Sequence, residues 1–160
     1  MGERVMLDFR PTAMATPTKT TWRQNRDPLW RGDAAASLTR PTPTANKSLV
    51  RHILYLDGAG RPSPYHSTSE EQAVAQRFAG RDGHIYSTSV RKVREAGVAH
   101  ISRIQLLGLL KGKGKGEGKW HSAFEVMQAR KYVELWQEHL LDYSGIAVPD
   151  IDAILAGLYE

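Results

Sequence analysis

The stretch that most limits how this chain can fold covers residues 65–90 and has the sequence YHSTSEEQAVAQRFAGRDGHIYSTSV. It begins with a run typical of a short strand, and EEQAVAQRFA then fits a helix with Val74 and Phe78 on one face. Ser69 is placed to cap that helix, and two glutamates lie at its positive end. Residues 80–83 turn the chain, and HIYSTSV is typical of a second strand. The sequence therefore predicts a unit of strand, short helix and strand.

The triplet Ser-Thr-Ser occurs twice in this stretch, at residues 67–69 and again at residues 87–89. Such triplets usually satisfy backbone groups at strand ends and turns, so neither copy indicates a site by itself. Only the first copy leads into a helix that contains Phe-Ala, whereas RKVREAGVAH follows the second. We therefore interpret the first triplet as the candidate site strand and the second as a strand edge.

The chain is expected to form one domain behind a loosely packed arm. Residues 1–27 are rich in Pro, Thr and charge and show no periodicity, so we interpret them as a leader or linker. Residues 28–160 then form the domain, because 160 residues with 41% hydrophobic residues suffice for one core and are too few for two. Within it, residues 48–56 fit either a helix or a strand, and a helix is expected over residues 98–110.

A loop and two helices are predicted for the remainder of the chain. Residues 111–120, KGKGKGEGKW, interleave charge with glycine and are expected to be a flexible loop. Ser122 and Glu125 then have capping-box spacing, and helical spacing of apolar residues continues until Gly145 ends the helix. The apolar positions are Ala129, Tyr132, Val133, Trp136 and Leu140. The segment VPDIDAILAGLY predicts a last short helix that starts near Pro149 and Asp150.

Several classes of protein are excluded or disfavoured by composition. The chain has no cysteine, which rules out disulfides, zinc thiolates and thiol nucleophiles. No apolar run approaches the ~18 residues of a membrane span, and the N-terminus lacks the apolar core of a secretory signal. The six histidines form no His-x-x-x-His pair, so no metal site is expected. The lysine-glycine run is not a phosphate-binding P-loop, because Lys113 and Trp120 stand where that motif needs Gly and Ser or Thr.

Charge is distributed unevenly over a chain whose net charge is +5. Residues 91–119 hold eight Lys or Arg against two Glu, whereas residues 120–160 hold two against seven Asp or Glu. A basic middle favours an anionic ligand or partner, such as a dinucleotide phosphate or a nucleic-acid backbone. The alternative, a basic loop that only contacts solvent, stays open.

Three segments in chain order carry a resemblance to a known family. They are Trp30-Arg31-Gly32-Asp33, then Ser67-Thr68-Ser69 with the Ala75 to Ala79 pattern, and a later glutamate after the glycine-rich loop. This arrangement resembles the mono-ADP-ribosyltransferases of the Arg, Ser-Thr-Ser, Glu class, which includes cholera toxin. The resemblance implies an α+β fold with two small packed sheets, flanking helices and an NAD cleft. It covers roughly residues 28–125.

The resemblance implies a glycosyltransferase that uses NAD as co-substrate, and simple chemistry agrees with the residue types. Cleavage of the nicotinamide–ribose bond passes through a cationic sugar, which needs a carboxylate beside the ribose and a cation for the pyrophosphate. Arg31 suits the pyrophosphate because its guanidinium meets phosphate with a planar fork of donors. Ser67 would bond the carboxylate or the ribose. The expected NAD-binding residues are Arg31, Gly32, Ser67, Thr68, Ser69, Phe78 and Tyr86, with Thr68 and Ser69 bracing the backbone.

Glu125 in HSAFEVM is the expected catalytic carboxylate, together with Arg31 and Ser67. The family's glutamate normally opens a strand, whereas the capping box places Glu125 in the first turn of a helix, so a purely structural Glu125 stays open. Family members also carry Glu or Gln two residues earlier, where it engages protein acceptors such as arginine. Ala123 occupies that position, which favours an RNA or DNA acceptor beside the basic residues 91–119.

The resemblance also suggests a biological setting. A compact transferase behind a Pro/Thr-rich leader is similar to the C-terminal toxin module of a secreted bacterial polymorphic effector, which acts in the cytoplasm of the target cell. A cognate immunity protein is the expected protein partner, and no membrane contact is expected. Two alternatives stay open: an RNA-cleaving toxin in which His66 or His121 works with Glu125 as acid and base, and a noncatalytic basic binding module.

Overall fold

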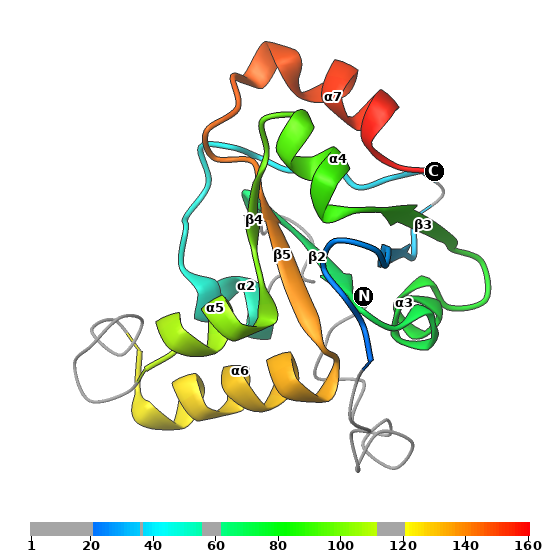
Figure 1. The fold of residues 1–160 in the computed structure, drawn as a ribbon. Coiled ribbons are helices and arrows are strands. Elements are labelled where there is room, and N and C mark those ends of the chain that lie inside the picture. Colours follow the sequence, from blue (N-terminus) through cyan, green and yellow to red (C-terminus); the bar gives the residue numbers. More distant parts are fainter. Residues whose placement is uncertain (1–20, 36, 56–61, 112–120) are drawn as a thin grey trace.

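The fold is mixed α+β, with one antiparallel sheet of five strands and six α-helices in the part of the chain that the structure describes. The structure is a computed structural model, and it describes residues 21–35, 37–55, 62–111 and 121–160. The strands are β1 (Leu29–Asp33), β2 (Tyr65–Ser69), β3 (His84–Thr88), β4 (Ala99–Ile101) and β5 (Glu138–Asp142), and they lie in the order β3-β1-β2-β5-β4 (Figure 1). The expected α+β class is confirmed.

The described strands form one sheet, where two small packed sheets were expected. Strands β1 and β3 pair over five residues, and so do β2 and β5. Between β1 and β2 the register has a single pair, Trp30 opposite Ser69. The sheet is therefore continuous through a narrow junction, and that junction lies beside the first Ser-Thr-Ser triplet.

Helices cover both faces of this sheet. They are α2 (Leu49–Tyr55), α3 (Gln72–Ala79), α4 (Val90–Glu95), α5 (Arg103–Leu109), α6 (Ala123–Leu135) and α7 (Ile151–Leu158), the last preceded by the short 3₁₀ helix η3 (Val148–Asp150). Figure 1 shows α2, α5 and α6 on one side of β5, and α4 and α7 on the other. Within the described residues, no helix is long and apolar enough to cross a membrane.

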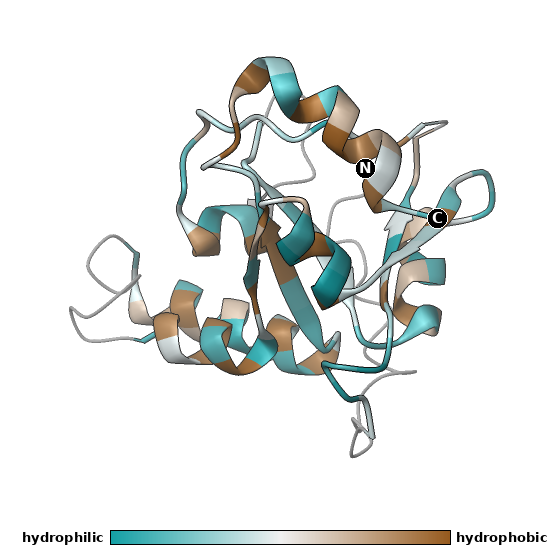
Figure 2. Cartoon of the chain, turned by 45° about the horizontal axis from the view of Figure 1, so that its top comes forward, coloured by the Kyte–Doolittle hydropathy of each residue, from teal (hydrophilic) through white to brown (hydrophobic). Residues whose placement is uncertain are grey.

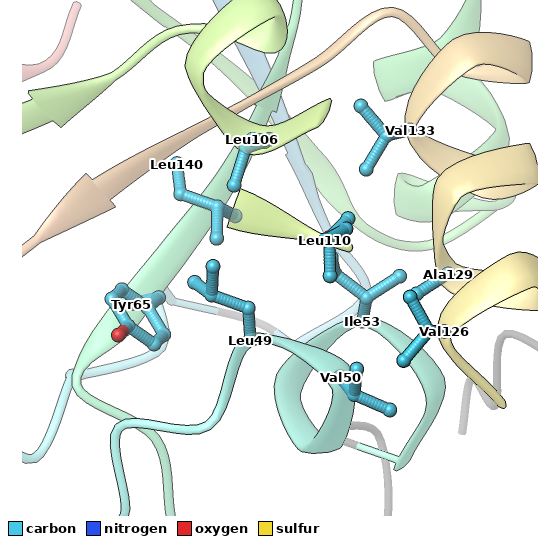
Figure 3. Close-up of a cluster of buried hydrophobic side chains, with 10 residues drawn as sticks. All are labelled: Leu49, Val50, Ile53, Tyr65, Leu106, Leu110, Val126, Ala129, Val133 and Leu140. Atoms are coloured by element: carbon cyan, nitrogen blue, oxygen red, sulfur yellow. The ribbon is translucent and has the colours of Figure 1, made fainter. Parts of the chain in front are cut away.

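Two clusters of buried apolar side chains hold these layers together. The first joins α2, α5 and α6 to β2 and β5, and its side chains point toward one another in Figure 3. Its members are Leu49, Val50, Ile53, Tyr65, Leu106, Leu110, Val126, Ala129, Val133 and Leu140. The second joins α4 and α7 to the other face of the sheet and contains Leu29, Val90, Val93, Val98, Leu141, Tyr143, Ile151 and Leu158. Adjacent strand residues alternate between faces, so Leu140 enters one cluster and Leu141 the other.

Helix α7 shows how sequence pattern and packing agree. Its sequence IDAILAGL has one charged residue, and its ribbon is hydrophobic over most of its length in Figure 2. Ile151 and Leu158 are buried in the second cluster, about two turns apart. The predicted short helix near Pro149 and Asp150 is confirmed.

Helix α3 packs so closely on β1 that only glycine fits at one strand position. A Cβ atom added to Gly32 would lie 1.8 Å from the carbonyl oxygen of Ala75. The predicted helix is thus confirmed, but it begins after Glu71 rather than at Ser69. The Ser69 hydroxyl accepts a hydrogen bond from the Glu71 amide at 3.0 Å, which stabilises the turn before the helix.

The largest difference from the sequence prediction concerns the long helix. Helix α6 begins with the expected capping box of Ser122 and Glu125, but it ends at Leu135. Gln137 has φ 47°, a left-handed conformation that stops the helix, and residues 138–142 form β5. The apolar spacing up to Leu140 misled because Leu140 is buried as a strand residue.

Smaller differences have local causes. Residues 48–56, left open as helix or strand, contain α2. Residues 98–110 contain β4 followed by α5, since Ser102 and Gln105 form a capping box in the middle of the expected helix. The unpredicted α4 starts after Ser89, whose hydroxyl accepts the Lys92 amide.

The expected leader and the lysine-glycine loop fall largely on residues outside the described ranges. Of residues 1–27, only residues 21–27 are described, and among them Trp22 packs against the second cluster. Its indole nitrogen donates to the Pro28 carbonyl at 2.7 Å. Residues 112–120 likewise lie outside the described part of the chain.

Candidate functional site

A serine and a glutamate from neighbouring strands meet at the centre of the candidate site. Ser67 lies in the middle of β2, and Glu138 is the first residue of β5. The Ser67 hydroxyl donates to the Glu138 carboxylate, with 2.6 Å between Oγ and Oε2. Glu138 is 2% exposed, whereas Ser67 is the one residue of β2 that is not fully buried. The carboxylate is therefore held inside the fold, and the serine lies at the accessible side.

His52 of α2 completes a directed chain of hydrogen bonds to this carboxylate. Its Nε2 atom lies 2.8 Å from Ser67 Oγ, and its Nδ1 atom lies 2.6 Å from Ser63 Oγ. The Ser67 proton is committed to Glu138, so His52 must donate from Nε2 and accept at Nδ1. Ser63 accepts the amide proton of Tyr65 at 3.1 Å and donates to His52. The ring of His52 thus fixes the orientation of the Ser67 hydroxyl.

Arg31 of β1 reaches the same strand position from the other side of the narrow junction. One guanidinium nitrogen donates to the Ser67 carbonyl and the other to Asp33 Oδ2, both at 3.1 Å. Asp33 is itself fixed by the Thr39 amide at 2.7 Å and the Thr39 hydroxyl at 2.9 Å. Arg31 therefore holds the backbone of β2 in place, which differs from the expected two-pronged phosphate clamp.

One donor of Arg31 has no acceptor among the residues that the structure describes. Its Nε atom is buried and makes no hydrogen bond to any residue in the described ranges. A buried N–H group without an acceptor costs free energy, so a bound oxygen atom would be favoured there.

Thr68 and Ser69 have the bracing role that the sequence predicted. The Thr68 hydroxyl donates to the His139 carbonyl at 3.0 Å, and the Ser69 hydroxyl donates to the Trp136 carbonyl at 2.7 Å. Both bonds tie β2 to the segment that enters β5. They keep Glu138 in register with the first triplet, since Ser69 and Glu138 are direct partners in the ladder.

The other expected NAD-binding residues lie on the surrounding elements. Gly32 contacts α3, as described above, and Phe78 of α3 packs edge-on against Trp136 with ring centroids 5.1 Å apart. Tyr86 of β3 is the ladder partner of Arg31 and packs against Tyr159.

The second triplet has structural contacts throughout. The Ser87 backbone pairs with Glu160 through two hydrogen bonds of 3.0 and 2.8 Å, Thr88 is buried, and Ser89 caps α4. The interpretation of this copy as a strand edge agrees with these contacts.

Glu125 is not brought to Arg31 and Ser67. Its side chain accepts the Ser122 amide at 3.1 Å in the capping box and lies 3.6 Å from His121. It sits in the first turn of α6, and the ten residues from there to Leu135 span about 15 Å of helix. Glu138, just beyond the far end of α6, takes the place that Glu125 was expected to fill.

The sequence pattern did not reveal Glu138, because the expected helix ran through it. A glutamate at the start of a strand after residue 125 is the signal that could have drawn attention to this residue.

No protein-family model matches this chain, and no curated protein or solved structure is significantly similar to it. Its function must therefore be argued from the side chains themselves. In the described part of the chain, no group of three or more His, Asp and Glu residues has the geometry to hold a metal ion.

The two histidines of the RNA-cleaving alternative lie in different surroundings. His66 is buried, with Nε2 donating to the Thr39 carbonyl at 2.6 Å and Nδ1 accepting from the Tyr159 hydroxyl at 2.8 Å. Burial lowers the pKa of His66 well below its usual value, so the ring is neutral. His121 lies beside Glu125, and its Nε2 atom is 2.8 Å from Ser48 Oγ.

Proposed function

We propose that this chain is an NAD-dependent mono-ADP-ribosyltransferase of the Arg, Ser-Thr-Ser, Glu class, with Glu138 as its catalytic carboxylate. The observation that carries the proposal is the 2.6 Å contact between Ser67 and Glu138, with Arg31 bound to the Ser67 carbonyl. The three residue types that name the class thus converge on one strand position. Glu138 also opens a strand, as the family's glutamate does.

The proposed chemistry uses the buried charge of Glu138. The bond between the ribose C1′ atom and the nicotinamide nitrogen breaks, and its electron pair leaves with nicotinamide. The positive charge that develops on the sugar is stabilised by the carboxylate, whose orientation is preset by Ser67 and His52. The acceptor group then donates an electron pair to C1′ and loses its proton to the solvent, which completes the transfer.

The same surroundings supply groups that would hold NAD. The free Nε donor of Arg31 suits an oxygen of the substrate, and Ser67 lies between the carboxylate and solvent. Phe78 and Tyr86 offer aromatic faces on the two elements that flank β1. The finer fold proposal follows: an ADP-ribosyltransferase-like domain whose cleft opens at the narrow junction of β1 and β2.

The residue two positions before Glu138 bears on the acceptor. It is Trp136, which is 1% exposed and stacks on Tyr132 with ring centroids 4.5 Å apart. The family uses Glu or Gln there to engage arginine acceptors, and a buried indole offers no such group. We therefore keep a nucleic acid, RNA before DNA, as the proposed acceptor. A secreted bacterial toxin module with an immunity protein remains the proposed setting.

The test is incubation of the purified chain with NAD that carries label in the adenosine half. The proposal expects release of nicotinamide, and transfer of label to RNA or DNA in preference to protein. Intact NAD at high enzyme concentration would refute the proposed activity. Labelled protein bands with unlabelled RNA and DNA would refute the proposed acceptor alone.

A further inference from the structure

A second cluster of titratable groups lies on the opposite face of the sheet from Ser67 and Glu138. His139 follows Glu138 in β5 and therefore points to the other face. Its Nε2 atom lies 2.7 Å from Glu70 Oε2, and its Nδ1 atom lies 2.8 Å from His100 Nε2. The two imidazole rings stack with centroids 5.1 Å apart. Carboxylate and two rings thus form one hydrogen-bonded line.

This line runs from the interior to the surface. The side chains of His139 and Glu70 are 2% and 3% exposed, and Arg103 pairs with Glu70 at 3.2 Å. His100 is half-buried on β4, a strand at the edge of the sheet. Its Nδ1 atom makes no hydrogen bond to any residue that the structure describes. The outer end of the line is therefore a ring nitrogen that a ligand could use.

The protons on this line can be assigned from its partners. Burial raises the pKa of Glu70, but the hydrogen bond from His139 and the neighbouring Arg103 outweigh it and hold the pKa below its usual value, so Glu70 is an anion that only accepts. His139 must then donate from Nε2. In the tautomer in which His139 donates only from Nε2, its Nδ1 accepts the proton of His100 Nε2, and His100 Nδ1 carries a lone pair.

A proton taken up at the outer end would not remain there. When His100 Nδ1 binds a proton, its Nε2 proton can pass to His139, where Glu70 balances the charge. Burial, with the charge of Arg94 contributing, lowers the pKa of His100 to about 4, so His100 itself is neutral near pH 7. The hydrogen bonds thus connect a ring nitrogen near the surface to a buried carboxylate.

Two arginines belong to the elements next to the outer end. Arg94 at the end of α4 is exposed, and Arg103 opens α5 directly after β4. Arg91 and Lys92 belong to the same short helix as Arg94, where they pair with Glu95 and Glu160. A neutral base next to two arginines is a suitable arrangement for a substrate that carries phosphate groups next to a hydroxyl.

We propose that Glu70, His139 and His100 form a proton relay, and that His100 is the base of a second site that cleaves RNA bound through its phosphates by Arg94 and Arg103. This activity is independent of the NAD chemistry proposed above.

The reaction balances without any further reactant. The 2′-hydroxyl oxygen forms a bond to the adjacent phosphorus as its proton moves to His100 Nδ1 and the Nε2 proton moves to His139. The bond from phosphorus to the 5′ oxygen breaks, and that oxygen takes a proton from water. The products are a 2′,3′-cyclic phosphate and a 5′-hydroxyl, and the relay returns its proton to the solvent.

The test uses the full chain and one 5′-labelled single-stranded oligonucleotide sequence in three forms: RNA, DNA and 2′-O-methyl RNA. RNA should be shortened to products with cyclic phosphate ends, and the other two forms should stay intact. His100→Gln should lower the RNA cleavage rate about 100-fold, because general base catalysis typically contributes that much or more. His84→Gln, at an exposed histidine on the other edge of the sheet, should leave it unchanged.

Two further variants separate this site from its surroundings. Glu138→Gln should not change RNA cleavage, and His100→Gln should not change nicotinamide release, which also reports that the variant is folded. Glu70→Gln should move the acid limb of the rate profile to lower pH, since loss of the charge weakens proton storage on His139. A uniform loss of rate at every pH would show that Glu70 has only a structural role, and it would refute the proposed proton relay. Intact RNA with the wild-type chain, or full activity in His100→Gln, would overturn the proposal.

Discussion

The Ser67 hydroxyl donates a hydrogen bond of 2.6 Å to the carboxylate of Glu138, which lies 71 residues later in the chain. This contact joins the middle of β2 to the first residue of β5, and the Arg31 guanidinium holds the Ser67 carbonyl at the same point. It places a buried carboxyl group beside a serine that is only partly buried. That arrangement suits stabilisation of a developing positive charge on a substrate.

Glu138→Gln should abolish most nicotinamide release from NAD. The substitution keeps the shape of the side chain and removes its charge, so a loss of about 100-fold or more in kcat is expected. Glu125→Gln is the matched control, because Gln also satisfies a capping box. It should leave the rate of nicotinamide release within twofold of wild type and the free energy of unfolding close to that of wild type. The reverse pattern, with Glu125→Gln inactive and Glu138→Gln active, would return the catalytic role to Glu125.

Ser67→Ala should lower kcat for nicotinamide release by about 10-fold to 100-fold, because the carboxylate of Glu138 loses the hydroxyl donor that orients it. Ser87→Ala is the control in the second triplet, where the backbone makes the contacts with Glu160. Steady-state kinetics of the two variants compare the triplets directly. Equal losses in both variants would contradict the distinction between them.

Gly32→Ala should destabilise the fold, because the added Cβ atom would lie 1.8 Å from the Ala75 carbonyl oxygen. Overpacking of this kind typically costs about 1–3 kcal/mol or more in the free energy of unfolding. At Gly108 of α5 a Cβ atom would meet nothing within 4 Å, so Gly108→Ala should instead stabilise by up to about 1 kcal/mol. Urea denaturation measures both changes, and a neutral Gly32→Ala would show that α3 can move away from β1.

The free energy of unfolding should fall as the pH is lowered from 7 toward 5. Burial lowers the pKa of His66, and burial with its charged neighbours lowers that of His100 to about 4, whereas both titrate near 6.5 in the unfolded chain. Between these pKa values the unfolded chain binds protons that the folded chain does not, so acid favours unfolding. The pKa of Glu70 is also lowered in the folded chain. Its contribution to the free energy of unfolding is therefore lost only at still lower pH, where the carboxylate becomes protonated.

His100→Gln removes one of these groups and keeps a donor toward His139. Its free energy of unfolding should therefore depend less steeply on pH between 7 and 5 than that of wild type. Urea denaturation at pH 5, 6 and 7 gives both slopes. Identical slopes would mean that His100 takes up its proton equally in the folded and unfolded chain.

The elements that the sequence predicted well are those with local signals. The bounds of strand β2 were predicted as residues 65–69, and the capping box of Ser122 and Glu125 was also predicted. Both depend only on neighbours within a few positions of the chain. The segments after the two Ser-Thr-Ser copies also differ locally, since α3 follows the first copy and α4 follows the second. These features need no knowledge of distant contacts.

The sequence missed Glu138 for a reason that is not local. Trp136 and Leu140 continue a helical spacing, but Gln137 adopts φ 47° and the chain leaves the helix to pair with β2. The preference for that turn arises from pairing with a strand some 70 residues away. Periodicity alone cannot distinguish a buried strand from the next turns of a helix in so short a run.

By itself, the sequence determined that this is one cysteine-free α+β chain with a basic middle and that the first triplet stands before a helix, because these depend on composition and on local spacing. Only the tertiary structure decided which carboxylate contacts Ser67. It also decided that the Arg31 guanidinium binds the backbone of β2, so that not all of its donors can face a ligand. It also brought Glu70, His139 and His100 into one line. Those outcomes depend on strand pairing across the sheet, which brings together residues that no local pattern connects.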